Sequence, residues 1–224
     1  MYGKVKLSKR QIKEDKFTTF MLKAKHQLHE NWQFYVIGVV VVILSITAAV
    51  YYVNILETKD NEAGEQFSRA LLDYRNGNNQ VAIMSFNQII DEYPGNKVAE
   101  QSTFLLGKVN LESKNYSEAI RYFEIYLDKY REDKMNRSAV YAGIASCYEN
   151  QGKYLEAAQE FKAAYDEYPD GPLIGDYLIS TMRNYLLVGE VEKARALLEK
   201  IKDLFSGTDL EARSIRLFFE KSRT

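Results

Sequence analysis

The sequence has 224 residues and a formal net charge of −1, which suits one domain of ordinary size. The charge is uneven, because residues 1–31 carry eight Lys or Arg against three Asp or Glu, and the remainder is mildly acidic. A mildly acidic main part excludes a nucleic-acid-binding domain, which would present a basic face. Few prolines, many Leu, Ala, Glu and Lys at helical spacing, and no strand-like alternation predict an all-α protein. The single cysteine, Cys147, excludes an internal disulfide.

Residues 1–31 form a basic and partly amphipathic segment, expected to be cytoplasmic. Phe17, Phe20 and Met21 recur at helical spacing with lysines around them. Three interpretations stay open at this point: an ordinary topogenic flank, a helix on anionic lipid, or a helix on a translocon-like partner. His26 and His29 are spaced like a metal pair, but the sequence shows no third ligand, so no metal site is predicted.

Residues 32–53, from Trp32 to Val53, contain no charged residue. At about 1.5 Å per residue they span a hydrocarbon core of roughly 30 Å. Trp32, Tyr35 and Tyr51 lie near the two ends, where amphipathic rings prefer the headgroup level. This pattern predicts one transmembrane helix in contact with the lipid bilayer. A buried core helix and a cleaved signal peptide are the alternatives, although signal peptides have a shorter apolar region and a shorter basic start.

Basic residues flanking the apolar segment predict its orientation. Eight Lys or Arg precede it, whereas only Lys59 and Arg69 occur in the first sixteen residues after it. The positive-inside rule then places the N-terminus in the cytoplasm and the rest of the chain outside, which is the periplasm of a diderm bacterium. Residues 54–62 are expected to be a linker.

Residues 63–207 contain an internal repeat at a spacing of 37 or 38 residues. The repeated residues are Gly107, Ala119 and Phe123, then Ala145, Tyr148, Gly152, Ala157 and Phe161, then Met182, Tyr185, Gly189, Ala194 and Leu198, with a weaker first copy at Gly77, Ala82, Phe86 and Pro94. A small residue in a first helix admits a second helix closely, glycine permits the turn between them, and alanine suits the tightest crossing.

This skeleton resembles the tetratricopeptide repeat (TPR) family, whose usual period is about 34 residues. The resemblance implies an α-solenoid of about four helical hairpins, at about 63–99, 100–137, 138–174 and 175–207. Residues 208–224 are expected to form a capping helix and tail, which would cover the last hairpin, with Thr208 or Asp209 as its N-cap.

The resemblance also implies a concave surface, lined by the first helix of each hairpin, that binds proteins or unfolded peptide segments. Projecting the repeat onto this chain gives the predicted groove residues Phe67, Leu71, Tyr74, Phe104, Lys108, Ser146, Asn150, Ile179 and Arg183. Each of them has packing between helices as the alternative role.

Catalysis finds no support in the sequence. The repeats contain no histidine, no Gly-rich phosphate loop and no HExxH or GxSxG motif, so neither catalytic residues nor a cofactor is predicted. Cys147 lies among apolar residues and is expected to be a buried small hydrophobe.

A short basic segment, one span and about four outer hairpins together resemble the ancillary subunit of the bacterial Sec translocon. That resemblance implies an inner-membrane protein with periplasmic repeats, which associates with the translocon and a periplasmic chaperone to hand over exported chains. The alternative is a structural scaffold that organises a membrane protein complex of the envelope.

Overall fold

A computed structural model describes residues 9–30 and 32–222, and this part of the chain is entirely helical apart from turns. Its helices are α1 (Lys9–Glu30), α2 (Trp32–Arg75), α3 (Asn79–Glu92), α4 (Lys97–Glu112), α5 (Tyr116–Lys129), α6 (Lys134–Asn150), α7 (Tyr154–Glu167), α8 (Ile174–Leu187), α9 (Val191–Leu204) and α10 (Asp209–Lys221). The all-α prediction is confirmed. Residues 1–8 and 31 of the predicted basic segment, and 223–224 of the predicted tail, lie outside the described residues.

The chain divides into two compact units, one up to residue 58 and one from residue 59. In the first unit, every side chain from Trp32 to Thr58 is exposed, including the whole uncharged segment. Within the described residues one helix, α2, is long and apolar enough to cross a membrane, a test that some core helices and signal sequences also pass. The exposure argues against a buried core helix.

Residues 54–62, for which the sequence predicts a linker, are helical, because α2 runs without a break from Trp32 to Arg75. The physical reason lies in the composition of the segment. It contains no proline or glycine to end a helix, and Leu56, Glu57 and Lys59 favour helix.

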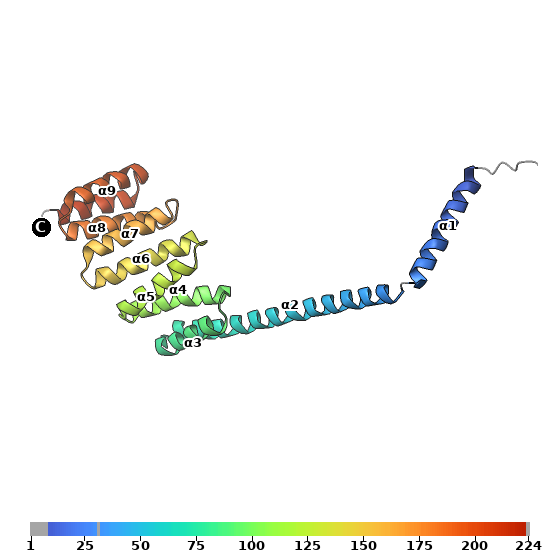
Figure 1. Ribbon diagram of the computed structural model, residues 1–224. Coiled ribbons are helices and arrows are strands. Elements are labelled where there is room, and N and C mark those ends of the chain that lie inside the picture. The colour runs from blue at the N-terminus through green and yellow to red at the C-terminus, as the bar shows by residue number, and fades with distance from the viewer. Residues whose placement is uncertain (1–8, 31, 223–224) are drawn as a thin grey trace, which may run out of the picture. The chain divides into compact units, whose positions relative to one another are not determined.

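The second unit is a stack of antiparallel helix pairs that follow one another in chain order, as Figure 1 shows for α3 to α9. The end of α2 pairs with α3, and the further pairs are α4 with α5, α6 with α7, and α8 with α9. The last helix, α10, packs against both α8 and α9. The repeat in the sequence therefore corresponds to a helical solenoid.

The turns inside the pairs need a left-handed residue, and the repeat supplies it at equivalent positions. Gly77, Gly152 and Gly189 have φ values of 80°, 73° and 79°. In the second pair the equivalent residue is Lys114, which has a φ of 62°. A side chain there is strained, because the left-handed region brings Cβ close to the backbone. The turn geometry is kept even where glycine is absent.

The crossings between helices depend on small residues facing one aromatic ring. A Cβ added to Gly107 of α4 would overlap the ring of Phe123 in α5, and one added to Gly143 of α6 would meet the same ring at 2.6 Å. Phe123 is 1% exposed. It thus fills a space that two successive first helices leave open, as the small-residue pattern predicted for Gly107.

The buried residues form three clusters along the stack. They centre on Phe86, on Phe123 and on Leu178. Each cluster joins residues of neighbouring pairs, so that no pair has a closed core of its own. At the end of the stack, Leu210 of α10 packs against Gly175, and the Thr208 hydroxyl accepts a hydrogen bond from the backbone of Glu211. Of the two N-cap candidates from the sequence, Thr208 is therefore the N-cap, and Asp209 is the first residue of the helix.

Candidate protein-binding surface

The first helix of each pair contributes to one surface, made by the end of α2 with α4, α6 and α8, which we call the first-helix surface. Polar contacts join the successive helices across it. The Tyr74 hydroxyl of α2 donates to Glu112 of α4 at 2.7 Å, and Arg183 of α8 pairs with Glu149 of α6. Helices α4 and α6 also pack directly. The surface is thus continuous along the stack.

All nine predicted groove residues lie on these helices. Asn150 is exposed, and the other eight are half-buried, neither sealed in the core nor fully open to solvent. The repeat brings equivalent residues into register, since Phe104, Ala142 and Ile179 hold one position and Lys108, Ser146 and Arg183 another. Binding at these residues stays a prediction.

The apolar members of the set pack partly against the core. The rings of Phe67 and Phe86 lie 6.0 Å apart between centroids. Phe104 stands 6.5 Å from Phe123 and 5.9 Å from Tyr126. Ile179 packs against the Leu178 cluster. These side chains pack against the core on one side and are partly exposed on the other. Packing between helices, the alternative role expected from the sequence, is therefore compatible with a place on the surface.

A polar network lies where α6 and α8 meet. Arg183 donates from Nε and Nη2 to Oε1 of Glu149 at 3.0 and 2.8 Å, and from Nη2 to Oε2 at 3.1 Å. Asn184 adds a third donor group, with Nδ2 3.1 Å from Oε1. The side chains of Arg183 and Glu149 are 37% and 25% exposed. The repeat pattern does not predict this pairing or the role of Asn184, since the partners are 34 and 35 residues apart in the sequence.

Two other predicted residues are engaged within their own helix. The Ser146 hydroxyl donates to the carbonyl of Ala142, and Asn150 donates to the carbonyl of Ser146, both at 2.8 Å. The side-chain oxygen atoms of Ser146 and Asn150 remain acceptors for a peptide N–H.

At Tyr74, burial and the hydrogen bond to Glu112 raise the pKa, so its phenol stays neutral.

Lys108 is the cationic member of the set that has no ion-pair partner among the described residues. It is half-buried on α4, one turn after Phe104 and one turn before Leu111. Because Arg183 is neutralised by Glu149, the ammonium group of Lys108 is the more available charge. The chemistry of this surface suits an extended chain with apolar side chains and an acceptor or acidic group beside Lys108.

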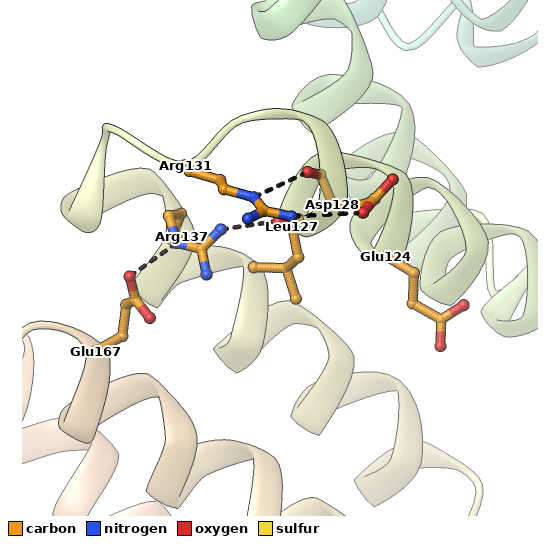
Figure 2. A pocket seen from close by; sticks show the side chains of 6 residues that line it. All are labelled: Glu124, Leu127, Asp128, Arg131, Arg137 and Glu167. Atoms are coloured by element: carbon orange, nitrogen blue, oxygen red, sulfur yellow. Dashed lines mark hydrogen bonds and ion pairs between the residues drawn. The ribbon is translucent and has the colours of Figure 1, made fainter.

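A surface pocket at the turn between α5 and α6 lies outside the predicted set (Figure 2). Its centre is Arg137, which donates from Nε to Glu167 at 2.7 Å and from Nη1 to the carbonyls of Leu127 and Tyr130 at 2.8 and 3.2 Å. Glu167 raises the pKa of Arg137. Partners from α5 and α7 already bind the guanidinium. The contacts of Arg137 in this pocket therefore join helices, which is a structural role.

Groups able to do chemistry are few in the described residues. Burial raises the pKa of Cys147 to about 11, so its thiol stays protonated at neutral pH and is a poor nucleophile. The part of the chain that the structure describes has no group of three or more His, Cys, Asp or Glu side chains placed to hold a metal ion.

Comparisons with known proteins agree with this architecture. A family model described as a tetratricopeptide repeat-like domain matches residues 25–172. No curated protein sequence matches the chain.

Among solved structures, a tetratricopeptide repeat protein from Parabacteroides merdae ATCC 43184 is similar with a TM-score of 0.60 and 14% identity, over 71% of this chain and 62% of that one. This chain therefore spans less than two thirds of the length of that relative. The putative kinesin light chain TPR-like repeats of Podosopora anserina match with a TM-score of 0.56 and 16% identity, over 73% of this chain and 86% of theirs. MamA from Desulfovibrio magneticus RS-1 matches with a TM-score of 0.53 and 16% identity, over 66% and 77%. At these identities the likeness concerns the fold alone.

Proposed function

Because the chain belongs to the tetratricopeptide repeat-like domain family, whose members bind proteins or peptides, we propose that it is a membrane-anchored adaptor with its repeats on the outer face of the inner membrane. In this proposal residues 32–53 cross the bilayer, and the first-helix surface binds unfolded segments of exported proteins beside the Sec translocon. A periplasmic chaperone would receive or supply these segments.

The observation that carries the anchor is the exposed, uncharged stretch of α2 from Trp32 to Val53. In water, so long an apolar surface would be strongly unfavourable, at about 25 cal/mol for each Å² left uncovered. A bilayer covers such a helix on all sides. The matched family region begins at residue 25, so it includes the apolar segment together with repeats.

The character of the first-helix surface supports an extended client. Half-buried apolar side chains such as Phe104 and Ile179 alternate with polar groups such as Lys108 and Asn150 over several helices. A long, mixed surface of this kind can hold a chain that is not yet folded, since an extended segment offers its own side chains and backbone in turn. Anchoring would raise the local concentration of surface and client.

Protease accessibility tests the topology. With the proposed orientation, protease added to intact spheroplasts removes the repeats and leaves a membrane-bound fragment that contains residues 32–53. Repeats that survive until the membrane is opened would refute the orientation. N-terminal sequencing of the mature protein in the same preparation separates an anchor from a cleaved signal peptide, since a start after Ala49 would contradict the anchor.

Site-specific crosslinking tests the function. We expect a photo-crosslinker at Lys108 or Asn150 to capture many different exported chains during synthesis, whereas one at Gln159, which is exposed on the second helix α7, captures few. Capture of one folded partner at fixed stoichiometry would instead identify a scaffold subunit of an envelope complex. Equal capture at all three positions would show that the first-helix surface has no special role.

A further inference from the structure

An apolar stripe runs along α1, outside the surfaces described so far. Phe17, Phe20 and Met21 are 65%, 66% and 53% exposed, and Ala24 continues the stripe one turn further. At 3.6 residues per turn these four positions fall within one face of the helix. Three large apolar side chains on one exposed face are unfavourable in water, so we expect another apolar surface to pack against them.

Lysines border this stripe on both sides. Lys16 and Lys23 stand four residues before and three residues after Phe20, at one edge, and Lys25 stands four residues after Met21, at the other. All three lysine side chains are exposed. An apolar face with cations along both edges is the pattern of a helix that lies in a membrane surface, where lysine stems follow the apolar region and their ammonium groups reach phosphates.

We infer that residues 16–28 of α1 lie in the headgroup region of the cytoplasmic leaflet, with the Phe17–Phe20–Met21 face toward the acyl chains and the lysines on anionic lipid phosphates. The inference rests on the proposed anchor, because α2 begins at Trp32, only two residues after α1 ends, and so brings α1 to the membrane surface. The charge is complementary as well: residues 1–31 carry eight basic against three acidic residues, and the cytoplasmic leaflet is negatively charged.

A lipid occupant explains both features of α1 at once. A partner protein would account for the apolar face, but it would not require cations along both of its edges. A purely topogenic segment would need the lysines but gains nothing from a continuous apolar stripe. The anchor itself, in addition, places the leaflet within reach of α1.

The test uses the full-length protein in liposomes that contain brominated lipids, which quench tryptophan fluorescence on contact. Trp32 is the only tryptophan, so the unaltered protein reports on the anchor. The variant F20W/W32F places the sole tryptophan in the stripe. The matched control T19W/W32F places it on the opposite side of α1, since residues 19 and 20 point roughly 100° apart and the stripe extends away from residue 19.

In liposomes with anionic lipid we expect quenching of Trp32 and of residue 20, and weak quenching of residue 19. Exchanging the anionic lipid for a zwitterionic one, or changing Lys16, Lys23 and Lys25 to Gln, should diminish quenching at residue 20 and leave that of Trp32 unchanged. Equal quenching at residues 19 and 20, or none at residue 20 while Trp32 is quenched, would overturn the inference and leave the anchor intact. Absence of quenching at Trp32 itself would overturn the anchor.

Discussion

At the residue scale, Lys114 shows how a repeat can keep its geometry without its usual residue. It occupies the left-handed turn position at which the three other helix pairs have glycine, and its φ is 62°. The neighbouring backbone keeps the turn closed, since the amide of Lys114 donates to the carbonyl of Leu111 at 3.0 Å. The strain is confined to this turn, and the helices on either side keep Lys114 in the left-handed conformation.

Lys114→Gly should therefore stabilise the protein by about 0.5–1 kcal/mol, because the relief of the left-handed strain exceeds the extra backbone entropy of glycine in the unfolded state. Lys114→Ala is the matched control and should bring little gain, since alanine keeps the Cβ that causes the strain. Urea denaturation followed by circular dichroism measures both. A glycine variant no more stable than the alanine variant would contradict the strain.

Glu160 is a second residue whose environment has a measurable effect. Burial, and then the negative charge of Glu124, raises the pKa of Glu160 above its ordinary value of 4.5. The folded protein thus holds this proton more tightly than the unfolded chain. Glu160 contributes stability while it is protonated, and that contribution is lost as the pH rises from about 4.5 through the folded-state pKa.

Glu160→Gln should accordingly be more stable than the unaltered protein at pH 7, and the difference should disappear below pH 4.5. The exposed Glu156 supplies the control, since Glu156→Gln should show no such pH-dependent gain. Denaturation midpoints at several pH values between 4 and 8 measure the effect. A constant difference between Glu160→Gln and the unaltered protein would speak against the raised pKa.

At the element scale, helix ends decide how one pair connects to the next. Pro94 and Pro169 follow α3 and α7, where proline cannot continue the helix. No proline follows α5, and there the side chain of Arg137 binds the end of the helix. Its guanidinium occupies carbonyls at the end of α5 and holds Glu167 at the end of α7 (Figure 2). One side chain of α6 thereby fastens three helices.

Arg137→Ala should destabilise the solenoid by about 2 kcal/mol, because two carbonyls and a carboxylate lose a charged hydrogen-bond donor in a mostly buried place. Arg131 lines the same pocket, but its side chain is 77% exposed, and Arg131→Ala should change stability by less than about 0.5 kcal/mol. The comparison of the two variants by thermal or urea denaturation decides the role of Arg137. Similar losses of stability in the two variants would show that the hydrogen bonds of Arg137 add nothing to the stability of the solenoid.

At the scale of the whole molecule, apolar surface is distributed unevenly between the two units. The repeats bury many of their large apolar residues in three clusters, whereas the side chains from Trp32 to Val53 are all exposed. A repeat array stabilised by contacts between neighbouring pairs does not need the apolar segment for its core.

A fragment of residues 59–224 should therefore remain helical and stay in solution without detergent. The full chain should need detergent or lipid, because its apolar segment otherwise associates with other copies. Circular dichroism and sedimentation, each with and without detergent, measure this difference. A fragment that unfolds or aggregates would show that the repeats depend on the preceding segment for their stability.

The sequence by itself determined the helical class, the period of the repeat and the small residues at the crossings, because these depend on spacing along the chain and on the size of single side chains. It also narrowed the N-cap of the last helix to Thr208 or Asp209, since an N-cap acts within a few residues, and the structure identifies Thr208. The sequence also predicts a linker at residues 54–62. The residues of that segment favour helix, so the composition alone does not distinguish a linker from a helix that continues.

Only the tertiary structure decided which distant residues meet. The pairing of Arg183 with Glu149 joins residues 34 positions apart, and the ring of Phe123 reaches Gly143 in the following pair. The contacts of Arg137 likewise depend on where α5 and α7 end. Such contacts follow from how successive helices pack, and the periodicity that predicts the helices leaves the partner of each charged side chain undetermined.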